Sequence, residues 1–320
     1  MDAVKISPVR PTFWHEIKRQ RNAYFFIAPF FTVFLLFMVF PIGYSAALSL
    51  TRWNGIVEAQ FVGLDHYRRA MGDNNFHRAL LNTLVFSALT VTISVVVGLT
   101  LALFLNSVRF FQRFFRSVFF IPSVVSLVVV ALLWKMILNS EVGMFNEAVH
   151  GFGVFMQWIG FKTPEWTRHQ YRFLDSSHHF VPLITMTLVN VWGVVGFNTV
   201  IFLAGLQGIP STMYEVAHMD GATWRQDLRY VTLPMLRPTM FFVVLITTID
   251  SLQVFVLPNV MNRGAASTMT VVYYLFQNAF EFYRMGYASA IAYVLFALTL
   301  IFSIIIRLVM GRRGRAEDFL

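Results

Sequence analysis

Polar side chains within otherwise apolar segments are the residues of this chain best suited to handle a solute. Thr247, Asp250 and Gln253 follow one another at three-residue intervals. On a helix that turns by roughly 100° per residue, they share one face, which Ser251 borders. Polar groups are costly in lipid and usually face a bundle interior or a watery cavity. We therefore expect these side chains to line a solute path.

A second polar group lies earlier in the chain. Asn190 and Asn198 are eight residues apart, so they can share a broad helix face, and Trp192 is close to them in sequence. Carboxamides donate and accept hydrogen bonds, and an aromatic ring covers the apolar face of a sugar, so the set suits a hydroxyl-rich solute. The alternative is that these groups only hydrogen-bond the helices to one another.

Catalytic motifs are absent from the sequence. It contains no phosphate-binding G-x-x-x-x-G-K-[ST], no H-E-x-x-H, no G-x-S-x-G and no cysteine. His178 and His179 could bind a metal, but neighbours in an extended segment point to opposite sides, and beyond Asp175 no carboxylate lies at ligand spacing. We therefore expect no catalytic residue, metal or cofactor in this chain.

The composition is that of an integral membrane protein, because 57% of the residues are hydrophobic. The net charge of +9 is better explained by basic loops beside membrane spans than by nucleic-acid binding. Segments long enough to cross roughly 30 Å of hydrocarbon recur, which predicts an all-α membrane protein with six transmembrane helices. The predicted spans are 24–50, 80–106, 117–138, 180–206, 239–261 and 286–309.

The distribution of Lys and Arg predicts the orientation of these spans. With the N-terminus inside, the inner segments 1–23, 107–116, 207–238 and 310–320 hold fourteen basic residues, against nine in the outer loops. Cytoplasmic loops carry the excess of Lys and Arg. We therefore expect a cytoplasmic N-terminal segment, a cytoplasmic tail and a cytoplasmic 207–238 loop. The long outer loop 139–179 is expected to pack over the external mouth and help to receive a partner.

The 207–238 loop is predicted to contain two short helices, because two residue pairs in it have the spacing of capping boxes. These pairs are Thr212 with Glu215 and Thr223 with Gln226. Gly221 between them can adopt the left-handed conformation that ends a helix. The second helix should carry an apolar stripe and stop at Pro234. The stripe consists of Trp224, Leu228 and Val231.

The same loop resembles the EAA signature of ABC importer permeases, in which E-A-A is followed after three residues by G and then after nine by I-x-L-P. Val216 and Val231 depart from it by small apolar exchanges. The resemblance implies that this loop is cytoplasmic and docks in a groove of an ATP-hydrolysing subunit. The residues expected to couple to that subunit are Glu215, Ala217, Asp220, Gly221, Ala222, Leu233 and Pro234.

Most of the chain is similar to the carbohydrate-uptake group of this family. The similar stretches are 40–55, 61–70, 116–137, 191–222 and 283–296. The resemblance implies an inner-membrane pore half that pairs with a second, homologous permease and with two ATPase subunits, on which ATP and Mg²⁺ bind. It also implies that an external solute-binding protein delivers the ligand.

Two other classes of protein are weighed against this interpretation. A proton-coupled secondary transporter could use Asp250 as its proton carrier, but no inverted repeat is visible. A lipid-dependent transferase would need a cluster of acids or histidines at one membrane interface. The identity of the solute stays open, because arginines in the outer loops suit an acidic saccharide whereas Asp250 argues against one.

Overall fold

The computed structural model describes residues 21–108, 112–159, 171–174 and 180–311, so His178 and His179 lie outside the described residues. The described chain is mostly helical. In its first part the elements are α2 (Arg21–Phe34), the π-helix η1 (Leu35–Val39), α3 (Phe40–Ser49), the antiparallel strands β1 (Thr51–Arg52) and β2 (Gln60–Phe61), α4 (Asp65–Gly72), α5 (Asn74–Ser107), α6 (Gln112–Val124), α7 (Leu127–Ile137) and α8 (Met144–Trp158). The remaining elements are α9 (Phe180–Gln207), α10 (Ser211–Met219), α11 (Trp224–Gln226), the π-helix η3 (Asp227–Thr232), α12 (Leu233–Met235), α13 (Arg237–Leu252), α14 (Val256–Asn262), α15 (Val271–Phe276), the π-helix η4 (Gln277–Glu281) and α16 (Met285–Gly311).

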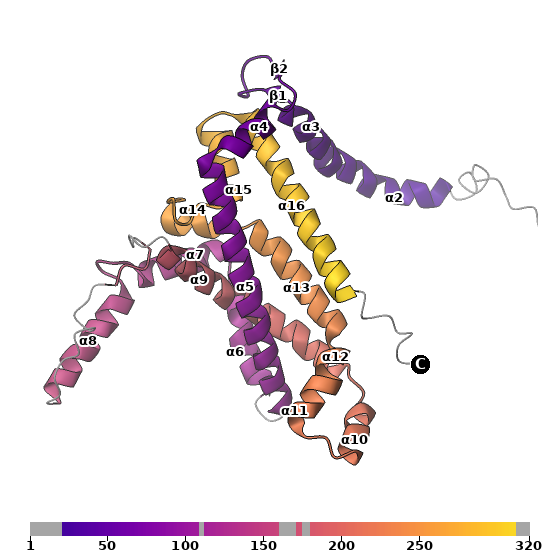
Figure 1. Cartoon of the computed structure of the whole chain (residues 1–320), viewed down its shortest axis with the longest axis vertical. Coiled ribbons are helices and arrows are strands. Elements are labelled where there is room, and N and C mark those ends of the chain that lie inside the picture. Colours follow the sequence, from indigo (N-terminus) through magenta and orange to yellow (C-terminus); the bar gives the residue numbers. More distant parts are fainter. Residues whose placement is uncertain (1–20, 109–111, 160–170, 175–179, 312–320) are drawn as a thin grey trace, which may run out of the picture.

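The long helix α5 forms the axis of the bundle, and α6, α9 and α13 pack around it (Figure 1). Small side chains allow these helices to approach closely, as in other membrane bundles. A Cβ built at Gly98 of α5 would lie 3.2 Å from the Cβ of Asn198 in α9. Ser87 of α5 and Ser251 of α13 share a buried hydrogen bond of 2.6 Å. The core thus combines tight backbone contact with paired hydroxyls.

Four continuous helical segments are long and apolar enough to cross a membrane, and up to six can be counted if each strongly bent pair is taken as one span. The continuous segments in the described part of the chain are Phe25–Ser49, α5, α9 and α16. They lie where four of the six predicted spans were placed. The all-α prediction agrees with the structure, whereas the count of six depends on how the bent helices are treated.

The other two predicted spans are broken in the structure. The 117–138 segment divides into α6 and α7, which meet at an angle of 94°. Ser126 between them has a ψ of 130°, which is incompatible with a continuous helix. The 239–261 segment divides after α13, and Gln253 follows as the first residue of a short link to α14. Neither segment is therefore the single straight helix that its hydrophobicity predicts.

The two short helices that result, α7 and α14, pack against each other. Lys135 of α7 donates from Nζ to the carbonyl oxygen of Val260 in α14 at 3.0 Å. Because this carbonyl lies in the last turn of α14, the contact satisfies a helix end as well as the ammonium group. Lys135 therefore has a structural role, because its hydrogen bond joins α7 to α14.

The helix formed by α2, η1 and α3 extends away from the bundle (Figure 1). None of its most apolar 18-residue window is buried. Only toward its end does α3 pack on α16, where the Tyr293 hydroxyl donates to the carbonyl of Ile42 at 2.5 Å. Most of this apolar helix is therefore exposed on every side, and the described part of the chain does not pack against it.

At the end of the bundle opposite the 207–238 loop, Asp73 joins three elements. Its carboxylate caps α5 by accepting from the backbone N–H of Asn75 at 2.9 Å, and it also accepts from the hydroxyls of Tyr274 (2.5 Å) and Tyr287 (2.8 Å). Burial raises the pKa of this carboxyl, but the hydrogen bonds outweigh burial and hold the pKa below its usual 3.8. Asp73 thus stays ionised and fixes α5, α15 and α16 to one another.

Candidate functional site

The 207–238 loop begins with helix α10, which ends at a glycine. Gly221 has a φ of 77°, so the prediction of a left-handed residue here is confirmed. The N–H of Gly221 donates to the carbonyl of His218, and the N–H of Ala222 donates to that of Ala217, both at 3.0 Å. These two bonds form a Schellman motif, which satisfies carbonyls in the last turn of the helix.

The second half of the loop is not a regular helix. Gln226 Oε1 accepts from the backbone N–H of Thr223 at 2.7 Å, as the predicted capping box requires. The chain then forms the π-helix η3, whose wider turn removes the 3.6-residue spacing on which the predicted apolar stripe depends. Trp224 is accordingly 69% exposed, whereas Leu228 is half-buried.

One prediction about the helix ends of this loop is wrong. Thr212 does not cap the first helix, because α10 begins at Ser211 after Pro210 and has no side-chain cap. The second helix continues through η3 and α12 and ends at Met235, one residue after the predicted stop at Pro234.

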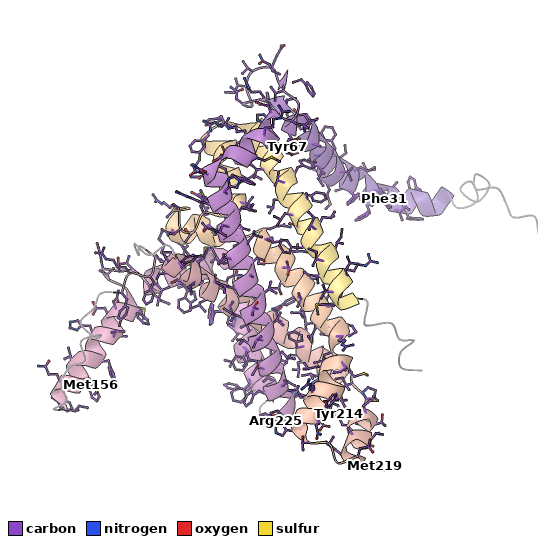
Figure 2. The ribbon with its side chains drawn as sticks, viewed as in Figure 1. Phe31, Tyr67, Met156, Tyr214, Met219 and Arg225 are labelled. Atoms are coloured by element: carbon purple, nitrogen blue, oxygen red, sulfur yellow. The ribbon has the colours of Figure 1, made fainter. Side chains whose placement is uncertain are left out.

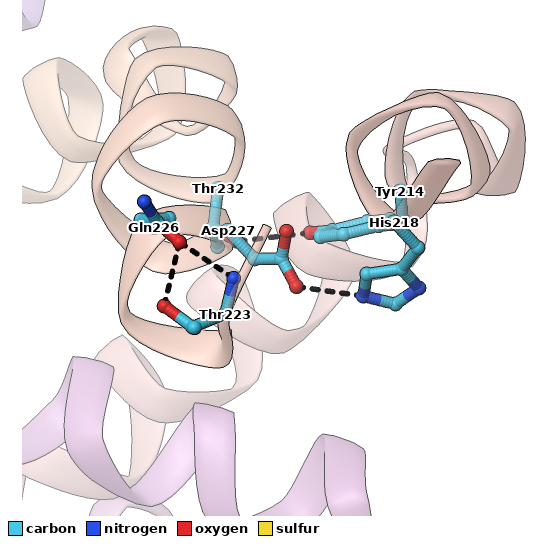
Figure 3. Close-up of polar contacts among 6 residues, drawn as sticks. All are labelled: Tyr214, His218, Thr223, Gln226, Asp227 and Thr232. Atoms are coloured by element: carbon cyan, nitrogen blue, oxygen red, sulfur yellow. Dashed lines mark hydrogen bonds and ion pairs between the residues drawn. The ribbon is translucent and has the colours of Figure 1, made fainter. Parts of the chain in front are cut away.

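Two side-chain contacts join the halves of the loop (Figure 3). His218 Nε2 lies 2.8 Å from Asp227 Oδ2, and the hydroxyls of Tyr214 and Thr232 are 3.1 Å apart. Each pair joins α10 to η3, so the loop is one compact body rather than two independent helices. Sequence reasoning missed these pairs, because their members are nine and eighteen residues apart and no local pattern connects them.

The tip of the loop exposes large apolar side chains. Met219 is 87% exposed, and Val216 is also exposed. Figure 2 shows Met219 and Arg225 at the end of the molecule that this loop forms. Glu215 and Asp220 lie exposed on the same body, and neither forms an ion pair among the residues that the structure describes. An apolar surface with free charges beside it is typical of a protein-binding site.

The other predicted coupling positions lie within the same body. Ala217 and Ala222 are half-buried and supply the carbonyl and the amide of one Schellman bond. Leu233 and Pro234 are half-buried in α12, next to the bend of 66° that leads into α13. They therefore connect the loop to a helix that lines the central cavity.

A cavity of about 420 Å³ lies between α5, α6, α7, α9, α13 and the start of α14. Five of the six residues predicted for the solute path line it. They are Asn190, Asn198, Thr247, Asp250 and Gln253. Thr90 and Ser123, which sequence reasoning missed, also line this space. The hydroxyl of Thr90 is buried without a partner in the described part of the chain. The two polar groups found in the sequence therefore face one common space.

Trp192 does not line this cavity. It is 40% exposed and packs edge to face on Trp134, with 5.7 Å between the ring centroids. Two residues along a helix are roughly 200° apart, so Trp192 lies on nearly the opposite side of α9 from Asn190. Phe197 and Phe255 supply the aromatic surface of the cavity instead.

The polar residues of the cavity are not equivalent. Asn198 Nδ2 donates to Thr247 Oγ1 at 3.3 Å, and both side chains are buried, so this pair joins α9 to α13 as the alternative interpretation proposed. Asp250 and Gln253 are exposed. Among the described residues Asp250 has no ion-pair partner. The groups most available to a solute are therefore Asp250, Gln253 and, at the cavity wall, Asn190.

A helical bundle with apolar spans, a polar central cavity and a compact loop with an exposed apolar tip at one end is the architecture of a membrane permease. Residues 94–315 match the family model described as the binding-protein-dependent transport system inner membrane component. The chain belongs to this family, and it is an ABC transporter permease of the inner membrane. Its role is transport rather than catalysis.

Relatives resemble the chain over almost their whole length. The arabinooligosaccharides transport system permease protein AraP of Bacillus subtilis is 31% identical, with 93% of this chain and 92% of AraP covered. The trehalose/maltose transport system permease protein MalF of Thermococcus litoralis is 32% identical, with 91% and 94% covered. The crystal structure of a bacterial ABC transporter involved in the import of the acidic polysaccharide alginate contains a chain of the same fold. Its TM-score is 0.78 at 23% identity, with 95% of this chain and 100% of that chain covered.

Proposed function

We propose that this chain forms one half of the membrane pathway of an ATP-driven importer for an oligosaccharide or a similar hydroxyl-rich solute. The observation that carries the proposal is the polar cavity, which offers carboxamide, carboxylate and hydroxyl groups beside two phenylalanine rings. This combination suits sugars. The names of AraP and MalF, both sugar-transport permeases, support the same solute class.

The partners follow from surfaces that the chain leaves uncovered. The apolar α2–α3 helix is almost unpacked, which supports pairing with a second, homologous permease. The excess of Lys and Arg in the segments predicted to lie inside supports six spans with both termini in the cytoplasm. The 207–238 loop then faces the cytoplasm, where two ATPase subunits would bind ATP and Mg²⁺. The opposite end of the bundle would receive a solute-binding protein.

The exposed tip of the 207–238 loop is assigned as the ATPase contact. The Schellman motif and the two side-chain contacts make this loop a compact body. Leu233 and Pro234 continue it into α13, which carries Thr247 and Asp250. A movement imposed on the loop by the ATPases would therefore move one wall of the cavity and change access to it.

Reversing the charge of Glu215 is expected to remove the ATPase subunits. The side chain is exposed, so Glu215→Lys should fold normally, but it would place a cation in the docking surface and disfavour association. We expect roughly a tenfold loss of ATPase that co-purifies from detergent-solubilised membranes, which corresponds to about 1.4 kcal/mol of lost binding.

Glu147→Lys in α8 makes the same charge change on another exposed helix, and it should retain the ATPase. If no ATPase accompanies even the wild-type chain, the importer proposal fails. Equal loss with both variants would contradict the assignment of this loop as the docking site.

A proton-coupled transporter is the second candidate, because Asp250 lies at the cavity without an ion-pair partner among the described residues. An ATP-driven importer needs this side chain only to hydrogen-bond the solute, and the amide of asparagine can still do so, so Asp250→Asn should keep roughly half or more of the wild-type uptake. Removing the charge should also tighten the apparent affinity for anionic saccharides by about five- to tenfold. A charge pair at 4 Å in a wet cavity is worth about 1 kcal/mol or more, and 1.4 kcal/mol corresponds to tenfold.

Radiolabelled uptake in cells, with and without an uncoupler at maintained ATP, tests this prediction. Asp250→Glu keeps the charge and serves as the control. Loss of uptake in Asp250→Asn, together with collapse of wild-type uptake by the uncoupler, would favour the proton-coupled transporter instead.

A further inference from the structure

A second polar cavity, of about 450 Å³, forms between the β1–β2 hairpin, α4 and the start of α16. These elements lie at the end of the bundle opposite the 207–238 loop (Figure 1). Its lining differs from that of the transport cavity, because it combines basic and aromatic side chains. The residues that define this outer pocket are Arg52, Trp53, Arg69, Tyr283, Arg284 and Tyr287.

The positive charge of the outer pocket is largely unneutralised. Three arginines line it, against the single carboxylate of Glu58. Arg52 lies 3.6 Å from Asp65, but neither Arg69 nor Arg284 forms an ion pair in the described part of the chain. A cleft lined by one sign of charge concentrates ions of the opposite sign. The pocket therefore attracts an anion.

Aromatic rings hold two of these guanidinium groups in place. Arg69 lies 4.9 Å from the ring centroid of Tyr287, and Arg284 lies 5.7 Å from that of Phe282. Such contacts orient an arginine without neutralising it, so its N–H groups stay free to donate. Guanidinium groups in this state form strong, charge-assisted hydrogen bonds with carboxylates.

Two further features indicate a binding site. His66, which also lines the pocket, is 6% exposed, and its Nε2 lies 3.0 Å from the carbonyl of Thr51. Since a carbonyl can only accept, Nε2 carries a proton, and Nδ1 is buried with no partner among the described residues. Tyr283 has a φ of 53°, a costly value for a bulky residue, and such strain concentrates at functional sites.

The transported solute is a poor candidate for the anion in this pocket. Asp250 places a carboxylate at the transport cavity, where it would repel an anionic solute. The lining of the outer pocket instead has the composition of a protein-binding hot spot, in which Trp, Tyr and Arg dominate the affinity. A pocket of this kind accepts one anchoring side chain, and the charge here selects an acidic one.

We propose that the outer pocket receives an aspartate or glutamate side chain of the solute-binding protein, with Arg69 and Arg284 as its partners. The inference rests on the proposed function, which supplies that protein as a partner at this end of the bundle. Docking of the acidic side chain places its carboxylate between guanidinium groups and covers Trp53 and Tyr283. The pocket thus fixes the position of the solute-binding protein over the bundle.

The test uses the assembled transporter in nanodiscs and the purified solute-binding protein that stimulates its ATP hydrolysis. Association and dissociation rates are measured at low and high salt. Arg284→Ala is expected to raise the Kd about tenfold, which is about 1.4 kcal/mol, and Arg284→Glu more, because hot-spot arginines carry much of the binding energy of an interface. The salt dependence of association should weaken in both variants. Arg284→Lys, which keeps the charge, should recover part of the affinity.

Arg68→Ala is the matched control. Arg68 lies beside Arg69 on α4 and is exposed, but it does not line the outer pocket. Arg68→Ala lowers the positive charge at this end of the bundle by the same amount as Arg284→Ala. Because an exposed charge outside the pocket contributes little, the Kd should change by less than about twofold. Equal effects of Arg68→Ala and Arg284→Ala would overturn the proposal, because only a general field would then be acting.

A second probe tests whether the carboxylate in the pocket belongs to an acidic saccharide rather than to the solute-binding protein. Digalacturonate is titrated into the same nanodiscs without the solute-binding protein. Binding that disappears in Arg284→Ala would overturn the proposal, because the pocket would then hold an acidic saccharide. The ATPase subunits should co-purify normally with every Arg284 variant, so a failure of the pocket proposal remains separate from a failure of the importer proposal.

Discussion

Replacement of Gly196 by alanine is expected to destabilise the bundle more than other single-methyl additions on α9. A Cβ at this position would lie 2.0 Å from the carbonyl oxygen of Phe119 and 3.1 Å from the Cα of Phe120, both backbone atoms of α6. No side-chain rotation can relieve such a contact, so α6 and α9 must separate. Overpacking of this kind costs typically 1–3 kcal/mol and sometimes more.

The effect is measured as thermal stability in detergent, by size-exclusion chromatography after heating. A loss of about 3 kcal/mol lowers the Tm by roughly 4–5 °C for a chain of this size. Gly193→Ala adds the same methyl group one turn earlier on α9, where no atom lies within 4 Å of the new Cβ. We expect this control to keep the wild-type Tm. A similar Tm for both variants would contradict the close α6–α9 contact.

The contrast between these glycines shows what the sequence can and cannot reveal. Both lie in one apolar run, and nothing in the local pattern separates Gly193, which lines the cavity, from Gly196, which contacts a backbone. The run itself is readily predicted, because length and hydrophobicity are sufficient to indicate a membrane helix. The structure accordingly has α9 at Phe180–Gln207, where 180–206 was expected.

The broken segments were harder to predict for a physical reason. An apolar run shows that a segment is buried in lipid or protein, but not that it is straight. The bend at Ser126 and the break at Gln253 are stable because α7 and α14 pack on each other, and that contact joins residues more than a hundred positions apart. Non-helical backbone is tolerated at such places when protein or a watery cavity covers it.

The candidate sites show the same division between local and distant information. Helical spacing was sufficient to group Asn190 with Asn198 on α9, and Thr247 with Asp250 on α13. That both groups face one cavity depends on how the two helices pack. Trp192 was misplaced because nearness in sequence was taken as nearness in space, although two residues along a helix point in nearly opposite directions. The His218–Asp227 contact depends on how two helices meet, which no spacing rule supplies.

Gly221→Arg is expected to uncouple transport from ATP hydrolysis while the protein still reaches the membrane. Gly221 has a φ of 77°, and no atom lies within 4 Å of an added Cβ. The added Cβ therefore meets no steric barrier, and its cost is the torsional strain of a left-handed residue, about 1–2 kcal/mol. A strain of this size is too small to unfold the bundle, but it opposes the Schellman bonds that hold the end of α10.

Release of these bonds would displace Met219 and the surrounding exposed surface, which we assign to the ATPase contact. We expect uptake, and ATP hydrolysis stimulated by the solute-binding protein, to fall at least about tenfold, since loss of 1.4 kcal/mol in one docking interaction has this effect. The membrane level, measured by immunoblot, should stay close to that of the wild type. Uptake at the wild-type rate with a normal membrane level would contradict the prediction.

Gly221→Asn separates the strain from the added bulk. Asparagine adopts the left-handed conformation more readily than other residues with a Cβ, because its short polar side chain bonds locally. It should therefore preserve the Schellman motif and retain roughly half or more of the transport activity, since the strain it adds stays below about 1 kcal/mol. If Gly221→Asn is as inactive as Gly221→Arg, the protruding surface at residue 221 itself must contact the ATPase, because the backbone conformation would then be intact in an uncoupled transporter.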